Sequence, residues 1–164
     1  MKKIIVALSV ALTLNVYAGT STIETLATKN GVKKCSPQLK IVGEYIVDDR
    51  PHATHSSWNK NDPDNRLYAS LTSKGYSDGD SHVTVIASPT SSGKCDATYI
   101  ETFALATSCM LAREETYKDW KYVGTLNMKT LMLENESGSV NVYLSAQGAN
   151  DNICLISKRE VVYQ

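Results

Sequence analysis

Four cysteines, Cys35, Cys95, Cys109 and Cys154, place the strongest constraint on how this chain of 164 residues can fold. They are separated by 60, 14 and 45 residues, and no Cys-x-x-Cys pair occurs. These spacings resemble no zinc knuckle, whereas an even number of cysteines is typical of a disulfide-bonded exported domain. Two disulfides are therefore predicted if the chain reaches an oxidising compartment.

The N-terminus predicts that the chain does reach such a compartment. Lys2 and Lys3 precede an apolar run over residues 4–14, and Val16 and Ala18 are the small residues that a signal peptidase accepts before its cut. The run of about eleven residues is too short to cross a bilayer, which needs roughly twenty. The sequence therefore predicts export, with the periplasm of a Gram-negative cell favoured and true secretion as the alternative.

Removal of the predicted signal peptide, residues 1–18, leaves a single globular domain over residues 19–164. Fifteen basic residues then face seventeen acidic ones, a formal net charge of −2. No basic stripe is present, so neither a nucleic-acid partner nor an anionic membrane partner is expected. The first cysteine, Cys35, is too far from the apolar run to carry a lipid, so no stable membrane anchor is expected. No oligomeric state is predicted.

The pairing of the four cysteines depends on the segment between the second and the third. If residues 95–109 are helical, fourteen residues at about 1.5 Å each separate the two Cα atoms by about 21 Å. A disulfide needs less than about 7 Å, so the pair Cys95–Cys109 is disfavoured. The pairs Cys35–Cys95 and Cys109–Cys154 are favoured, and the crossed arrangement remains the alternative.

Most of the domain shows the alternation of apolar and polar residues that indicates β-strands with one buried face. A first strand is predicted over residues 39–47, and two more run through Leu67–Leu71 and Val83–Ala87. Later strands are predicted over residues 120–126, 129–134, 140–144 and 153–162, separated by the turn-like segments 134–138 and 147–152.

From Tyr99 onward, the apolar residues recur at the period of a helix rather than that of a strand. Tyr99, Phe103, Ala106 and Met110 fall at spacings of four, three and four, which predicts an amphipathic helix over about 97–117. A strand over residues 97–105 is the competing interpretation, since threonines are frequent there. The predicted fold class is α+β, a mainly antiparallel β-sheet packed on this one main helix and braced by disulfides.

Residues 48–64 read DDRPHATHSSWNKNDPD and are predicted to form a long polar loop. Arg50, His52, His55 and Trp58 make this loop the candidate element for contacting a partner, because loops on rigid scaffolds carry function. A weaker hypothesis is a zinc or copper site built from His52, His55 and Asp49. Turn-forming residues around the histidines favour an ordinary exposed loop over a metal site.

Catalytic signatures such as a Gly-x-Ser-x-Gly elbow, a His-Glu-x-x-His motif or a phosphate-cradling loop do not occur. Bridged cysteines are not nucleophiles, so no catalytic residue and no cofactor is predicted. The first functional hypothesis is a module that binds another extracytoplasmic protein, for instance an inhibitor or immunity factor for a cell-wall hydrolase or toxin. The alternatives are a metal- or small-ligand-binding protein and a small enzyme with a dispersed site.

Overall fold

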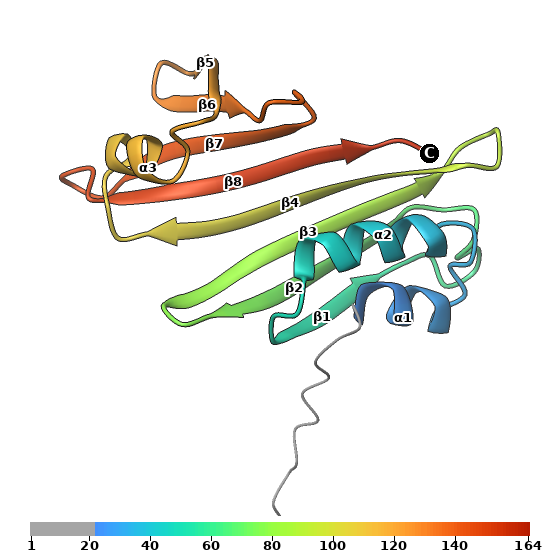
Figure 1. The fold of residues 1–164 in the computed structure, drawn as a ribbon. Helices are drawn as coiled ribbons and strands as arrows, with labels where there is room; N and C mark the ends of the chain where they lie inside the picture. The colour runs from blue at the N-terminus through green and yellow to red at the C-terminus, as the bar shows by residue number, and fades with distance from the viewer. Residues whose placement is uncertain (1–21) are drawn as a thin grey trace, which may run out of the picture.

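The computed structural model describes residues 22–164, so the predicted signal peptide lies outside the described residues. Eight antiparallel strands form one sheet in the order β1-β2-β3-β4-β8-β7-β6-β5 (Figure 1). The helices are α1 (Thr22–Lys29), α2 (Ser36–Val47) and α3 (Cys109–Glu115). The strands are β1 (His52–Ser57), β2 (Tyr68–Tyr76), β3 (Gly79–Pro89), β4 (Cys95–Leu105), β5 (Lys121–Leu126), β6 (Thr130–Glu134), β7 (Val140–Gln147) and β8 (Ile153–Val162). The predicted α+β class with a mainly antiparallel sheet is confirmed.

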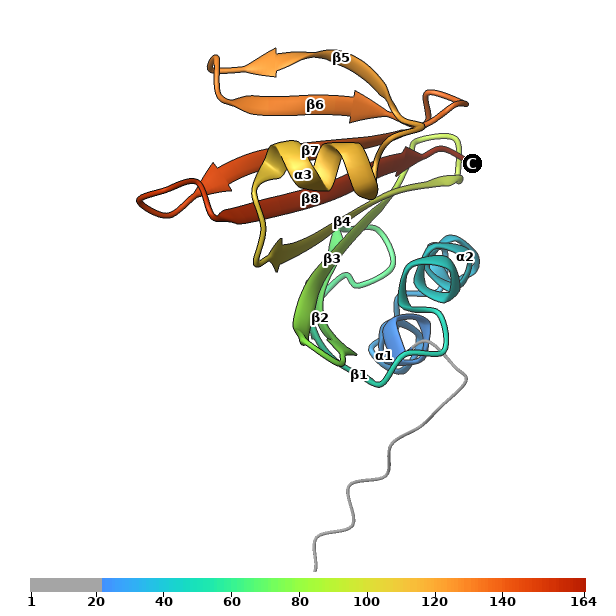
Figure 2. The same cartoon turned by 60° about the vertical axis from the view of Figure 1, so that its left-hand side comes forward.

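The three helices cover one face of the sheet. In β4, Cys95 and Tyr99 belong to a buried cluster with α1 and α2, while Phe103 and Leu105 pack against a second cluster with α3. Alternate residues of a strand point to the same face, so both clusters lie on one side of the sheet. Figure 2 shows α1 and α2 beside β1–β4, and α3 in front of β7 and β8. No described helix covers the opposite face.

The prediction of a strand over residues 39–47 is wrong, because these residues form most of α2. Leu39, Val42 and Ile46 are buried at spacings of three and four, the period of a helix face that packs on a sheet. Ile41 and Tyr45, which the alternating pattern placed on the buried face, are exposed. The pattern was ambiguous because Val42 and Ile46, which lie between the alternating residues, are also apolar and complete a helical period with Leu39.

The prediction of a helix over 97–117 is also wrong in its position. Residues 95–105 form β4, the competing interpretation, and only Cys109–Glu115 form a helix. Ser108 begins α3 because its side chain accepts a hydrogen bond of 3.2 Å from the Leu111 backbone N–H, which satisfies one otherwise unpaired donor. The main helix on the sheet is therefore α2.

The predicted polar loop over residues 48–64 contains a strand. His52–Ser57 form β1, which pairs with β2 at the edge of the sheet, so the loop prediction is wrong for these six residues. The other predicted strands are confirmed, since they correspond to β2, β3 and β5 to β8. Short turn-like segments between runs of β-forming residues made these strands recognisable in the sequence.

Both favoured disulfides are confirmed, Cys35–Cys95 with a Cα–Cα distance of 5.2 Å and Cys109–Cys154 with 4.8 Å. The first joins the N-terminus of α2 to β4, and the second joins the N-terminus of α3 to β8. Each bridge therefore connects the helical layer to the sheet. Two such bridges suit an oxidising compartment outside the cytoplasm. Within residues 22–164, no helix is long and apolar enough to cross a membrane.

Removing either disulfide is expected to lower the free energy of unfolding by about 4 kcal/mol, because each bridge closes a long loop in the unfolded chain. The loops span 60 and 45 residues, so the two losses should be nearly equal. Urea unfolding of Cys35→Ala/Cys95→Ala and of Cys109→Ala/Cys154→Ala measures both. A loss below about 1 kcal/mol for either pair would contradict this expectation.

Candidate functional site

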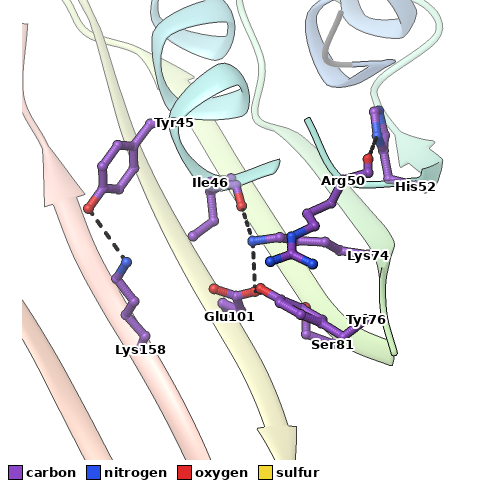
Figure 3. A network of polar contacts seen from close by, with 9 residues as sticks. All are labelled: Tyr45, Ile46, Arg50, His52, Lys74, Tyr76, Ser81, Glu101 and Lys158. Carbon is purple, nitrogen blue, oxygen red and sulfur yellow. Dashed lines mark hydrogen bonds and ion pairs between the residues drawn. The ribbon is translucent and has the colours of Figure 1, made fainter. Parts of the chain in front are cut away.

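A band of polar and aromatic side chains separates the two buried clusters on the helix-covered face. It contains Lys74 and Tyr76 of β2, Ser81 of β3, Glu101 of β4 and Lys158 of β8 (Figure 3). These residues occupy positions that alternation directs toward the helices, where apolar residues would otherwise continue the core. Lys74, Ser81 and Glu101 are buried, whereas Tyr76 and Lys158 are partly open to solvent, so the band runs from the interior to the surface. Two hollows lie beside it.

The centre of the band is a buried ion pair. The Lys74 Nζ lies 3.1 Å from Glu101 Oε1, and the two side chains are only 8% and 6% exposed. Lys74 also donates a hydrogen bond of 2.7 Å to the backbone carbonyl of Ile46. That carbonyl belongs to the last turn of α2, the negative end of the helix dipole, which favours a nearby cation. The ion pair thus fastens the end of α2 to the sheet.

Glu101 is bonded further by its neighbours. Its Oε1 accepts hydrogen bonds from the Tyr76 hydroxyl at 3.1 Å and from the Ser81 Oγ at 2.8 Å. The Arg50 guanidinium lies over the Tyr76 ring, 4.7 Å from its centroid. Lys74 and Glu101 are therefore each held by several bonds, and this geometry positions the end of α2 on the sheet.

Tyr117, just after α3, is buried near this carboxylate. Burial, the charge of Glu101 and the neighbouring Tyr76 raise the pKa of Tyr117 to about 12. A phenolate would be poorly solvated here and repelled by a carboxylate. Tyr117 is therefore held in its neutral form over the whole physiological range.

The first hollow is a groove of about 320 Å³ between α2 and the second half of the sheet. It is lined by Ile41, Val42 and Tyr45 of α2, by Tyr99 of β4, by Val140, Glu160 and Val162 of β7 and β8, and by Asn135 and Ser139 near the β6–β7 turn. Ile41 is 60% exposed and Tyr45 is 57% exposed. The groove is therefore an apolar, partly aromatic surface open to solvent.

Charged groups lie at two places beside the groove. The Tyr99 hydroxyl donates a hydrogen bond of 3.0 Å to Glu160 Oε2, and burial together with the nearby Tyr45 and Glu160 raises the pKa of Tyr99. Lys158 donates to the Tyr45 hydroxyl at 3.5 Å and lies over that ring, 5.1 Å from its centroid. The groove therefore presents a carboxylate among apolar side chains, while the neighbouring cation is turned toward an aromatic ring.

The structure separates the residues of the predicted partner-contacting loop. His52 lies on the helix side of β1, where its Nδ1 donates to the Arg50 carbonyl at 2.8 Å and its Nε2 accepts from the Thr22 backbone N–H at 3.3 Å. His55, three residues along the same strand, points to the opposite, exposed face. Trp58 packs against the first buried cluster.

The positions of the two histidines on β1 also argue against the hypothesis of a zinc or copper site. His52 and His55 project from opposite faces of β1, and Asp49 is exposed in the segment before it. Both ring nitrogens of His52 are engaged by backbone groups. Within residues 22–164, no group of three or more His, Cys, Asp and Glu side chains is placed to hold a metal ion. These histidines therefore do not form one metal site in this structure.

Sequence reasoning missed the central ion pair and the groove. One signal was present: Lys74 continues the alternating set that begins at Tyr68, and Glu101 continues the set that begins at Cys95, so each places a charge at an inward position. The groove had no such signal, because Ile41 and Tyr45 were assigned to a strand.

No protein-family model, no curated protein and no solved structure matches the chain. The fold, the buried ion pair and the groove are therefore the observations on which a functional proposal rests.

Replacing Lys74 by Met should lower the free energy of unfolding by about 3 to 5 kcal/mol, because Glu101 would keep a buried charge without its partner. The double variant Lys74→Met/Glu101→Leu should recover much of this loss, since it removes both charges. Lys121→Met is the matched control: it breaks an exposed pair with Glu134 and should cost less than about 1 kcal/mol. Equal losses for the two single variants in urea unfolding would refute the special role of Lys74.

The raised pKa of Tyr117 predicts that the protein loses stability in alkali. The folded chain retains this proton up to about pH 12, whereas the unfolded chain releases it near 10. The contribution is complete below pH 10 and decreases between pH 10 and 12, by about 3 kcal/mol in total. Tyr117→Phe should make the loss of stability between pH 10 and 12 measurably smaller. Tyr163→Phe, at an exposed tyrosine, should leave this loss unchanged. Urea unfolding at successive pH values compares the three proteins.

Proposed function

We propose that the protein is an extracytoplasmic protein-binding module whose binding surface is the groove between α2 and β8. The observation that carries this proposal is the exposure of Ile41 and Tyr45 beside Val140 and Val162 in one concave surface. Tyrosine is enriched at the centres of protein interfaces, because it combines apolar area with a polar end and few rotatable bonds. The periplasm is the favoured compartment.

The partner that fits this groove is an apolar segment of another protein with a hydrogen-bond donor or a basic group. Burying an exposed aliphatic or aromatic side chain stabilises a complex by about 1.5 to 3 kcal/mol. Glu160, with Asn135 and Ser139 at the rim, supplies acceptors that such a donor requires. An inhibitor or immunity factor for a cell-wall hydrolase or toxin is a protein of this class.

Preorganisation supports the same proposal. The wall of the groove is α2, whose start is bonded to β4 by the Cys35–Cys95 disulfide and whose end is bonded to Lys74 of the buried ion pair between β2 and β4. A wall fixed at both ends loses little conformational entropy when a partner binds. The groove therefore has its binding shape before the partner binds.

A small apolar ligand is the second candidate occupant. The groove volume of about 320 Å³ lies at the lower end of the range of small-molecule sites, about 300 to 1,000 Å³. Such a ligand would also contact Ile41 and Tyr45. The two candidates differ in whether a protein of defined stoichiometry is recovered with the chain.

Replacing Ile41 by glutamate should abolish partner binding, because it places a charge in the apolar groove. In a pull-down from envelope extract, the mature chain is compared as bait with Ile41→Glu and with Met110→Glu. Met110 is the matched control because it is 63% exposed on α3, outside the groove. We expect one stoichiometric protein to be retained by the wild type and by Met110→Glu and lost from Ile41→Glu, with binding of the purified pair at least about tenfold weaker for the latter.

Two results would contradict the proposal. Equal retention by both variants would place the interface elsewhere on the molecule. Recovery of no partner, with a bound small molecule identified by mass spectrometry of the extracted wild-type chain and missing from Ile41→Glu, would favour the second candidate. Circular dichroism of each bait verifies that the substitution leaves the fold intact.

A further inference from the structure

The second hollow lies where β3 and β4 separate. Their antiparallel pairing runs from Pro89–Cys95 to His82–Thr102 and stops there. Beyond this point, residues 79–81 pair only with β2, and residues 103–105 pair only with β8. Figure 1 shows the end of β4 diverging from the β2–β3 hairpin. Two strand edges therefore face each other without a backbone ladder between them.

A pocket of about 230 Å³ occupies this gap, lined by Tyr76 and residues 78–80 on one side and by residues 103–105 on the other. Unpaired backbone N–H and C=O groups at a strand edge are a template for pairing with an extended chain. Phe103 and Leu105 contribute apolar surface to the same pocket. The shape and the backbone groups therefore suit a short extended peptide.

The charges at this pocket are negative. Asp78 and Asp80 both line it, and neither forms an ion pair with another described residue. Asp80 accepts a hydrogen bond of 2.7 Å from the Ser73 Oγ, which fixes its carboxylate. The nearby cation Lys74 is already paired with Glu101. Arg50 lies over the Tyr76 ring and also forms no ion pair with either aspartate, so a positive group on the peptide would meet two carboxylates without an ion-pair partner among the described residues.

Tyr76 provides a fixed wall for the pocket. Its hydroxyl is bonded to Glu101, and its ring is stacked under Arg50. A side chain held at both its ring and its hydroxyl has little entropy to lose when a peptide packs against it. The pocket is thus preformed on its hairpin side.

We propose that the gap between β3 and β4 binds a short extended segment of a protein through backbone hydrogen bonds to residues 79–81 and 103–105, with a Lys or Arg side chain reaching Asp78 and Asp80. This site is distinct from the groove at α2 and does not depend on the function proposed for that groove. A free polyamine shares the positive charge but lacks the peptide backbone, and the experiment below separates these two sources.

The test is an NMR titration of the ¹⁵N-labelled mature chain. The probe is the peptide acetyl-Thr-Val-Lys-Val-Thr-amide, compared with its Lys-to-Glu analogue, with an analogue whose backbone nitrogens are methylated, and with spermidine. Only the lysine peptide should produce saturable shifts at the amides of residues 79–81 and 103–105. A dissociation constant in the millimolar range is expected for so short a segment.

Two variants test the role of the carboxylates. Asp78→Asn/Asp80→Asn keeps the shape of the pocket and an acceptor for Ser73, and should weaken the lysine peptide about threefold to tenfold. Glu136→Gln changes one charge on the exposed β6–β7 turn, outside this pocket, and should leave the affinity unchanged.

Any of the following results would overturn the proposal. Equal binding of the Glu peptide would exclude charge selection, and equal binding of the methylated peptide would exclude backbone pairing. Spermidine shifts of the same size would show a simple cation site. The lack of any shift at these amides at millimolar peptide would show that the gap binds no extended segment. None of these results bears on the Ile41 experiment, so failure at one site is distinguishable from failure at the other.

Discussion

The buried contact among Lys74, Glu101 and the Ile46 carbonyl is the interaction on which the arrangement of the helical layer depends. It lies between two hydrophobic clusters that share one face of the sheet but do not merge. A buried charge pair contributes little net stability when both partners are present, yet loss of one partner is costly. The pair therefore acts less as a source of stability than as a constraint on where α2 can end.

Together with the Cys35–Cys95 disulfide, this contact fixes α2 at both ends to the sheet. Cys35 immediately precedes Ser36, the first residue of α2, and Ile46 lies one residue before its last. The start of α2 is attached to Cys95 of β4, and its end is attached to Lys74 of β2, which is itself paired with Glu101 of β4. Because α2 cannot slide along the sheet without breaking one of these attachments, Ile41 and Tyr45 remain beside Glu160 and Val162.

The sequence predicted the later strands and both disulfides but misassigned α2 and β4, two of the elements that line the groove. Strands β5 to β8 were predictable because clear turns separate short alternating runs. In β4, Tyr99 and Phe103 are four residues apart, a spacing that fits both a helix face and one face of a strand. The Lys74–Glu101 contact could not be predicted, since it requires the register of three neighbouring strands.

The same carboxylate also connects the two proposed surfaces. Glu101 Oε1 accepts from Lys74, which holds the end of α2, and also from Tyr76 and Ser81, which belong to the hairpin beside the gap. The β3–β4 ladder ends at His82, and Ser81 is the next residue of β3. A side-chain bond from Ser81 to Glu101 thus replaces the missing backbone bonds at the point where the strands diverge. The hairpin is therefore held to β4 by a side chain at the point where strand pairing has ended.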